Sequence, residues 1–281
     1  MPLVAKNVTY RHSGATAPAL RGLSLEIGAG HVVALCGAAR TGRSTALALL
    51  AGLSAPEEGE VTVDGVRAAA PDARGRVGLL LQNADEALFG LTVRDDVMFA
   101  PLQLGLSSQK ARDRAERALH AVELKPIVFG DRSPFSLSGG QRRRAAIAGL
   151  MAMEPAYLLL DEPFSGLDPQ GRSETTSVIR SIATEGFGRH TGILVALSDL
   201  ELALRLADHI LILHGGHIVW QGSTAAYVTA PPEVDAWGLS QPELVSLSQD
   251  LRRRGWLVPV DKADPATLAT AIAAHLRMAR R

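Results

Sequence analysis

Short apolar segments bounded by turns open the chain and predict β-strands. Residues 23–27 alternate apolar and polar positions, as a strand buried on one face does. Residues 32–36 are continuously apolar, which is typical of a strand buried on both faces. Residues 60–65 predict a strand that ends in a turn, and residues 77–81 predict another buried strand. A helix is predicted over residues 44–51, directly after the second of these strands.

Helical sequence replaces the strand pattern between residues 91 and 153. The segments 110–122 and 141–153 are rich in Ala, Arg, Glu and Leu, which favour helices. Three more buried strands are predicted at residues 156–160, 193–197 and 210–212. Apolar strands that alternate with helices favour a mostly parallel α/β sheet covered by helices on both faces.

The pattern changes near Thr229, at an Ala-Pro-Pro sequence. Residues 240–243 form a capping-box sequence with a proline in the first turn, which predicts a helix that Gly255 ends. Asp264 and Pro265 predict the start of a second helix. The tail is therefore predicted to be a small appended domain.

Composition limits the classes of function. The chain has 281 residues, of which 47% are hydrophobic and 21% charged, as in globular proteins. Its formal net charge is zero, so we expect no nucleic-acid partner. The single cysteine, Cys36, excludes a disulfide within the chain and is interpreted as a small buried hydrophobe. Since no apolar run approaches the ~20 residues of a membrane helix and the first residues lack a signal-peptide core, we expect any membrane role to be peripheral.

Two glycines and a serine open the helix predicted at 141–153. In the sequence Leu137 to Gln141, free backbone N–H groups, a hydroxyl and the positive end of a helix dipole converge on one point, which suits a phosphate. A glycine-rich turn before a helix is the alternative interpretation. Two acids follow the strand at 156–160, at the end where open α/β sheets bind ligands. Asp161 is placed to hold Mg²⁺, and Glu162 is placed to orient or deprotonate water. The alternative interpretation of these two acids is a solvated surface turn.

Residues 37–45, Gly-Ala-Ala-Arg-Thr-Gly-Arg-Ser-Thr, lie between a buried strand and a helix, as a phosphate-binding loop requires. The usual pattern has a lysine where this chain has Arg43, which keeps the charge but replaces a compact ammonium with a planar fork. Ser44 keeps the hydroxyl expected to bind Mg²⁺. Arg40 occupies a position that is normally glycine, where a side chain hinders the approach of phosphate.

The three motifs occur in the order and on the elements of ABC-type ATPase subunits, which the chain resembles over roughly residues 3–225. The resemblance implies a P-loop NTPase (RecA-like) α/β fold with a mostly parallel sheet. It also implies an N-terminal antiparallel β subdomain, a helical subdomain at about 83–154 and a C-terminal appended domain. The expected division is a nucleotide-binding domain at 1–228 and a helical or mixed domain at 229–281.

The resemblance also implies ATP and Mg²⁺ as ligands and assigns the site residues. The residues implied to be catalytic are Glu162, Gln82 and, where the family has a histidine, Ser198. The residues implied to bind nucleotide are Tyr10, Gly37, Ala38, Ala39, Arg40, Thr41, Gly42, Arg43, Ser44, Thr45, Ser138, Gly139, Gly140 and Gln141. The residues implied to hold the metal are Ser44, Gln82 and Asp161. The sequence 165–168 resembles the loop that crosses between the two subunits of a dimer.

A narrower resemblance, carried by residues 81–105 and by the tail that begins at Trp237, is to the ATPase subunits of energy-coupling-factor transporters, which take up vitamins, cobalt or nickel. It implies a subunit peripheral to the cytoplasmic face of the cell membrane, with integral membrane subunits docking near residues 83–105. Asp95 and Asp96 either receive a basic residue of the membrane subunit or act only as acids at a helix N-terminus.

Three positions expected to shape the loop or contact the terminal phosphate are altered, namely Arg40, Arg43 and Ser198, whereas the sequence 137–141 is intact. Family members clasp two ATP molecules between the loop of one subunit and the signature of the other. We therefore expect a heterodimer in which this chain donates a working signature to a second ATPase. Its own loop is expected to bind nucleotide weakly or to hydrolyse it slowly. The alternatives are a self-sufficient homodimer in which Arg43 replaces the lysine, a soluble ABC ATPase outside transport, and a non-catalytic assembly module.

Overall fold

A six-stranded sheet forms the centre of the computed structural model, which describes residues 1–82, 88–185, 190–256, 258 and 265–278. Its strand order is β10-β9-β3-β8-β7-β6. The strands are β3 (Val32–Cys36), β6 (Val77–Leu80), β7 (Tyr157–Asp161), β8 (Gly192–Leu197), β9 (His209–His214) and β10 (His217–Ser223). All neighbouring pairs are parallel except β9 and β10. The predicted mostly parallel sheet is therefore confirmed.

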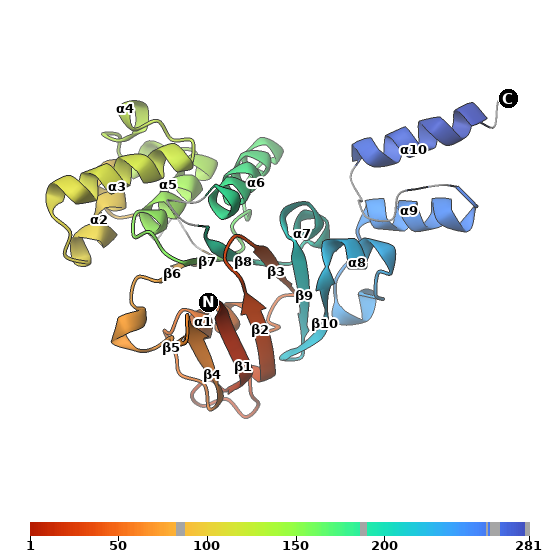
Figure 1. The fold of residues 1–281 in the computed structure, drawn as a ribbon, viewed down its shortest axis with the longest axis horizontal. Coiled ribbons are helices and arrows are strands. Elements are labelled where there is room, and N and C mark those ends of the chain that lie inside the picture. Colours follow the sequence, from red (N-terminus) through yellow and green to blue (C-terminus); the bar gives the residue numbers. More distant parts are fainter. Residues whose placement is uncertain (83–87, 186–189, 257, 259–264, 279–281) are drawn as a thin grey trace.

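A second, antiparallel sheet has the order β2-β1-β4-β5. It consists of β1 (Leu3–Tyr10), β2 (Leu20–Ile27), β4 (Glu58–Val63) and β5 (Val66–Arg67). Its buried side chains share one hydrophobic cluster with α1 (Arg43–Leu50) and with Val33 and Leu35 of β3. The helix thus joins the two sheets, and the antiparallel sheet lies below the central one in Figure 1.

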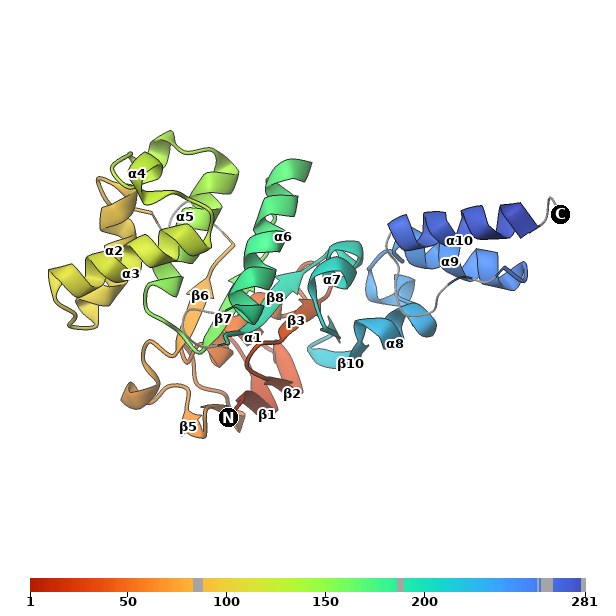
Figure 2. The ribbon, with the colours of Figure 1, turned by 45° about the horizontal axis from the view of Figure 1, so that its top comes forward.

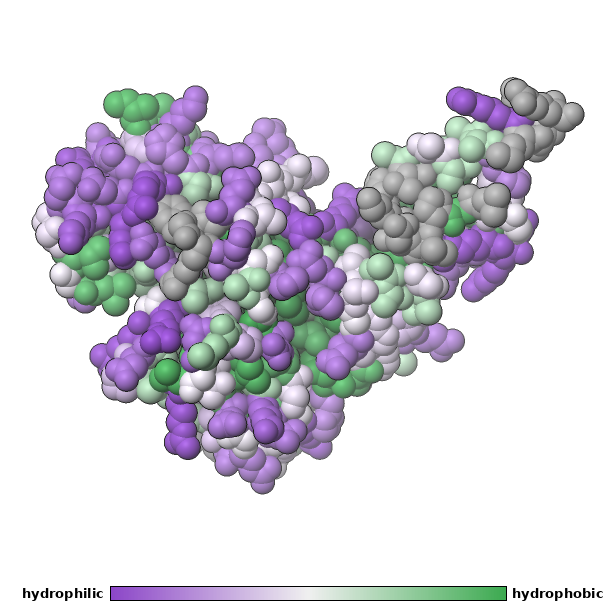
Figure 3. All heavy atoms as spheres, viewed as in Figure 1, coloured by the Kyte–Doolittle hydropathy of each residue, from purple (hydrophilic) through white to green (hydrophobic). Residues whose placement is uncertain are grey.

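Helices cover the other face of the central sheet, where Val32, Ala34 and Cys36 enter a second hydrophobic cluster. The helices between β6 and β8 are α2 (Val93–Gln103), α3 (Ser108–Ala121), α4 (Pro126–Phe129), α5 (Gly139–Met151) and α6 (Pro169–Thr184), and α7 (Leu200–Leu206) follows β8. In Figures 1 and 2, α2 to α5 form a group to one side of the sheet. Figure 3 shows apolar surface at the position of α4, where Ile127 is 93% exposed.

The tail contains α8 (Thr224–Thr229), α9 (Glu243–Arg253) and α10 (Pro265–Met278), and it extends away from the helical group (Figure 1). Val234, Leu239 and Val245 belong to the main hydrophobic cluster, whereas Leu251, Val258 and Leu268 form a separate small one. The hydrophobic core of the nucleotide-binding part therefore continues past residue 228, and the division at that residue stays a prediction. Within the described ranges, no helix is long and apolar enough to cross a membrane.

One local prediction in the tail is wrong. Ser240 does not cap a helix, because α9 begins three residues later and Pro242 occupies the cap position without a side-chain hydrogen bond. The Gln241 side chain accepts a hydrogen bond from the Tyr227 hydroxyl at 2.5 Å and donates to the Pro232 carbonyl at 3.4 Å. These contacts hold the segment against α8, so tertiary packing overrides the local capping signal. Gly255, with a φ of 81°, does follow the last turn of α9, as predicted.

Candidate functional site

Four parallel strands end at the same edge of the central sheet, and each is followed by predicted site residues. The strands are β3, β8, β7 and β6, which precede the residue 37–45 loop, Ser198, Glu162 and Gln82 in turn. A cavity of about 700 Å³, called here the loop cavity, lies at this edge. It is lined by His12, Ala19, Ala39, Arg40, Gly42, Arg43, Ser44, Thr45, Gln82, Asp161, Glu162, Ser165 and Ser198. The fold therefore brings together residues that are far apart in the sequence.

The backbone of the loop requires glycine at two of its predicted positions. A Cβ atom on Gly37 would lie 2.6 Å from the Leu213 carbonyl oxygen, and Gly42 has a φ of 104°. Gly42 also occupies the N-cap of α1, where no side chain accepts the first N–H groups of the helix. These N–H groups and the helix dipole are suited to a phosphate. Arg40 has a φ of 64°, an uncommon conformation for a residue other than glycine.

Arg43 is paired with the predicted base. Its Nη1 atom lies 2.8 Å from Oε1 of Glu162, and the two side chains are only 11% and 18% exposed. The two groups do not have the alignment of a hydrogen bond, so the contact is an ion pair whose attraction is mainly Coulombic. In this conformation the Arg43 guanidinium, expected to bind a phosphate, is therefore paired with the Glu162 carboxylate, expected to act on water.

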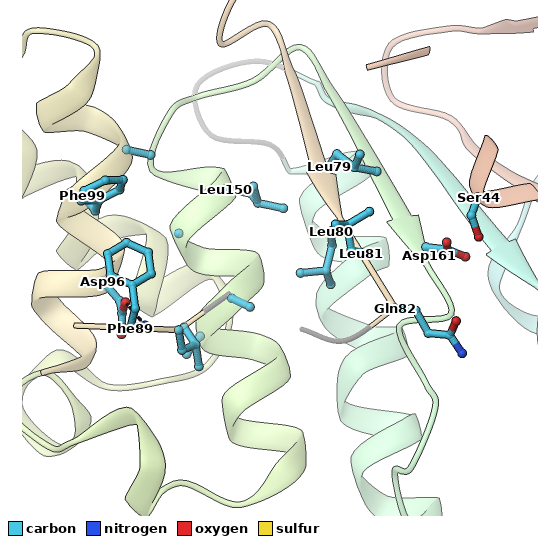
Figure 4. Close-up of a pocket in the computed structure, with 15 residues that line it drawn as sticks. Ser44, Leu79, Leu80, Leu81, Gln82, Phe89, Asp96, Phe99, Leu150 and Asp161 are labelled. Carbon is cyan, nitrogen blue, oxygen red and sulfur yellow. Dashed lines mark hydrogen bonds between the residues drawn. The ribbon is translucent and has the colours of Figure 1, made fainter. Parts of the chain in front are cut away.

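Oxygen donors gather beside this pair, as Mg²⁺ requires. Asp161 is 4% exposed at the end of β7, and it lines the loop cavity together with Ser44 and Gln82. Figure 4 shows these three side chains at one end of the neighbouring groove. A carboxylate, a hydroxyl and an amide oxygen fit a magnesium ion, which would supply charge neutralisation for the phosphates.

Ser198 lies exposed at the end of β8 and reaches the loop cavity, where the family has a longer, basic histidine. A smaller cavity of about 420 Å³ adjoins it, bounded by Ala38, Ala39 and the tail segment 238–243. A Cβ atom on Gly238 would lie 3.2 Å from that of Ala38, so the tail packs directly against the loop.

Tyr10 was predicted to stack on a nucleotide base, but His12 is the aromatic residue that lines the loop cavity. The His12 Nε2 atom is 3.1 Å from Oγ1 of Thr45 in α1, and its ring meets that of Tyr10 edge-on at 5.0 Å. Tyr10 itself packs against the hydrophobic cluster of the antiparallel sheet. Sequence reasoning missed His12, for which the nearby aromatic position was the only signal.

The signature, residues 137–141, lies outside the loop cavity. Ser138 caps α5, and a capping box forms because Ser138 and Gln141 each accept a hydrogen bond from the backbone N–H of the other. A Cβ atom on Gly139 would meet nothing within 4 Å, and one on Gly140 would meet only atoms at 3.8 Å or more. The first turn of α5 is thus open to approach from outside the chain.

A groove of about 590 Å³ runs from the site to the helical subdomain. Figure 4 shows Phe89 and Phe99 at the end far from Ser44 and Asp161, and their rings meet edge-on at 4.8 Å. Asp96 lines this groove and is 8% exposed. Residues 83–87, which belong to the predicted docking segment 83–105, lie outside the described residues.

The two acids at the start of α2 differ in their contacts. Asp95 is exposed and bonded to its cap Thr92, as an acid at a helix N-terminus is. Asp96 accepts hydrogen bonds from the N–H groups of Phe89 and Gly90 on Oδ1, at 2.9 and 2.8 Å. Among the described residues, its buried Oδ2 atom has no hydrogen-bond partner.

Two titratable groups with shifted pKa values lie at the ends of β3. Burial raises the pKa of the Cys36 thiol to about 12, against the opposing effect of Arg43. At the other end, burial alone would raise the pKa of Asp208, but hydrogen bonds from Arg180 and the Val32 N–H bring it below the ordinary value. Asp208 holds the start of the strand that delivers the loop, through its bond to the Val32 N–H, whereas Cys36 is a buried residue of the strand itself.

Comparison with known proteins adds independent information. The family model described as ABC transporter matches residues 20–165. The energy-coupling factor transporter ATP-binding protein EcfA2 of Symbiobacterium thermophilum is 38% identical over 282 residues, covering 98% of this chain and 95% of that protein. The structure of cbiO1 from Clostridium perfringens, part of the ABC transporter complex cbiONQ, has a TM-score of 0.74 at 28% identity and covers 88% of this chain and 98% of that one. A bacterial ABC transporter cassette solved as a dimer has a TM-score of 0.67 at 28% identity, covering 79% of this chain and 98% of that one.

Proposed function

Because this chain belongs to the ATP-binding proteins of ABC transporters, we propose that it couples ATP binding and hydrolysis to uptake through membrane subunits of the energy-coupling-factor type. The similarity to EcfA2 along nearly the whole chain supports this narrower assignment. The groove beside Gln82 supports it as well. A segment of a membrane subunit that docks in this apolar groove would contact Gln82, which also lines the loop cavity.

The chain works as the signature donor of an asymmetric pair. The observation that carries this proposal is the Arg43–Glu162 ion pair, which occupies both the phosphate-binding cation and the base of the chain's own site. Ser198 adds no charge toward a terminal phosphate. The signature, in contrast, keeps its capping box and its open glycine turn. The signature is therefore the competent part of this chain, and the chain offers it to a second ATPase.

The acids and amides of the site and the groups of the signature take separate roles in hydrolysis. Glu162 accepts a proton from the attacking water or orients it, and Gln82 lies beside it to hold that water. In the partner's site, the Ser138 hydroxyl and the N–H groups of Gly139 and Gly140 contact the phosphates that the partner's loop holds. In its own site, the Arg43 guanidinium must leave Glu162 before the base can act.

The asymmetric pair is tested by ATP hydrolysis of the chain alone and of the complex recovered through a tag on this chain. We expect Ser138→Arg to abolish hydrolysis by the complex and Glu162→Gln to leave most of it. Arg117→Gln, which removes an ion pair to Glu154 far from both sites, is the matched control. If the chain alone hydrolyses ATP rapidly and Glu162→Gln stops it, the homodimer alternative replaces this proposal. Recovery of no membrane subunit would favour an ATPase outside transport.

The membrane subunit docks in the groove and places a basic residue near Asp96. Among the described residues no group bonds to the buried Oδ2 of Asp96, and such an oxygen is costly, so a cation that reaches it would stabilise the complex. Asp96→Asn keeps the oxygen that the Phe89 and Gly90 N–H groups use and replaces the charged Oδ2 with an uncharged NH2 group. We expect it to lower recovery of the membrane subunits, whereas Asp95→Asn on the exposed side should not. Equal recovery with both variants would contradict the docking role of Asp96.

A further inference from the structure

Three basic side chains line the loop cavity, and two of them already have partners. Arg43 is paired with Glu162 at 2.8 Å, and the His12 Nε2 atom is 3.1 Å from Oγ1 of Thr45. The third is Arg40, which is exposed and forms no ion pair or hydrogen bond with any residue that the structure describes. Arg40 is therefore the basic side chain of this cavity that remains available to a ligand.

The backbone around Arg40 keeps the shape of a glycine loop. Arg40 has a φ of 64°, in the left-handed region where a residue other than glycine costs free energy. The Thr41 hydroxyl donates a hydrogen bond to the Ala38 carbonyl at 2.9 Å and thereby fixes the turn that contains Arg40. The N-cap of α1, Gly42, follows two residues later. The arginine is thus accommodated in the loop without a change of the turn, at the cost of a strained backbone conformation.

The charges of the cavity leave a phosphate short of a cation. Asp161 and Glu162 bring two carboxylates to its wall, whereas Arg43 is engaged by Glu162 and Ser198 carries no charge. A guanidinium presents N–H groups in a rigid planar fork that matches two oxygens of one phosphate, and such charge-assisted bonds are strong. The cavity, of about 700 Å³, has the size of a small-molecule site. Arg40 therefore supplies the charge and the geometry that the rest of the cavity lacks.

We propose that the Arg40 guanidinium binds the terminal phosphates of a nucleoside triphosphate in the chain's own site. The side chain that was expected to hinder phosphate is then a ligand of it. Nucleotide can be held through Arg40 while Arg43 stays paired with Glu162, so the site retains ATP without a free base. This inference rests on the proposed function, because it concerns the ATP site that the proposal describes as slow.

The test is calorimetric titration of the full chain, without a partner, with ATP, ADP and AMP in the presence of Mg²⁺. The variants are Arg40→Gly and Arg40→Asn, because glycine and asparagine both tolerate a positive φ and remove the charge. Arg67→Gln is the matched control, since Arg67 is an exposed arginine in β5 and does not line the loop cavity. Thermal unfolding of each variant reports its stability.

We expect both Arg40 variants to raise the Kd for ATP about tenfold, equivalent to ~1.4 kcal/mol, as the loss of a hydrogen bond to a charged group does. The Kd for ADP should rise less, the Kd for AMP should stay unchanged, and Arg67→Gln should match the wild type. The unfolding temperature should not fall, because each substitution relieves the strain at this position. If one of the two variants does not fold, the other decides.

The sign of the change separates a ligand from an obstacle. If the Arg40 side chain only hinders phosphate, both variants will bind ATP more tightly, which would overturn the inference. An unchanged Kd for ATP, or an equal weakening of ATP and AMP, would overturn it as well. A wild-type chain that binds no ATP would also overturn it, but would leave the donation of the signature intact. Rapid hydrolysis by the chain alone would contradict the asymmetric pair and not the role of Arg40.

Discussion

Replacing Arg43 with lysine should strengthen ATP binding in the chain's own loop. The Arg43 Nη1 and Glu162 Oε1 atoms are 2.8 Å apart, and both side chains are mostly buried. ATP phosphates must therefore compete with the Glu162 carboxylate for the guanidinium. A lysine side chain ends one bond short of the Nη1 position, so it releases Glu162 and presents a compact ammonium to the phosphates.

The magnitude follows from the distance and the burial of the pair. At an effective dielectric constant of ~20, the gross Coulomb attraction at this separation is about 6 kcal/mol. Desolvation of the two charges offsets most of this attraction, and the pair lacks an aligned hydrogen bond. A net contribution of about 1–2 kcal/mol lies between the values for exposed and buried pairs. Since about 1.4 kcal/mol corresponds to a factor of ten, we expect a roughly tenfold lower Kd.

The assay is calorimetric titration of the full chain with ATP and Mg²⁺ in the absence of a partner. Glu162→Gln serves as the second variant, because it removes the competing charge and leaves Arg43 in place. Both variants should tighten binding by a similar factor, and the double variant should add little further, as expected for two changes to one contact. If Arg43→Lys weakens binding while Glu162→Gln leaves it unchanged, Arg43 already serves the phosphates and the competition does not exist.

Three further outcomes can be checked. Cys36 should react with a maleimide only as fast as the chain unfolds, because burial raises its pKa to about 12 and the thiolate is the reactive form; rapid labelling in native buffer would contradict this. Asp208→Asn should lower the thermal stability, because a carboxylate whose pKa is lowered in the folded state stabilises the fold until it is protonated. The loss of stability should stay constant at neutral pH and shrink only below the ordinary pKa of 3.8. A loss that already shrinks between pH 7 and 5 would refute this. Ser198→His should raise hydrolysis by the chain's own site only together with Arg43→Lys, because Glu162 cannot act as the base while it is paired with Arg43. A full effect of the single variant in the ATPase assay would argue against the ion pair.

Local patterns in the sequence predicted the elements that carry the chemistry. The apolar run at β3 (Val32–Cys36) is found at its predicted bounds, and the helix predicted at 44–51 is observed at Arg43–Leu50. Burial on both faces leaves a continuous apolar signal, and the loop that follows needs glycine at fixed places. Such features depend on neighbours in the chain, so the sequence alone contains them.

Features that depend on distant residues were not predictable in this way. The ion pair of Arg43 with Glu162 and the bonds of Arg143 to Gln82 and Ser165 join segments separated by many residues. The failed capping box at Ser240 has the same cause, because the Tyr227 hydroxyl decides the conformation of that segment. A single sequence reports which side chains are present but not which of them the fold brings into contact.

The position of β3 in the sheet has a consequence for how the protein is made. Val32 pairs with Ile193 of β8, and Val33 pairs with His209 of β9, so the strand that carries the loop is synthesised long before either neighbour. Pairings this distant in sequence are slow to form, and until they form both edges of an apolar strand are exposed on the ribosome. The loop acquires its shape only when most of the chain has emerged. A chain that stops before β8 and β9 lacks both neighbours of β3 and therefore cannot assemble the loop cavity.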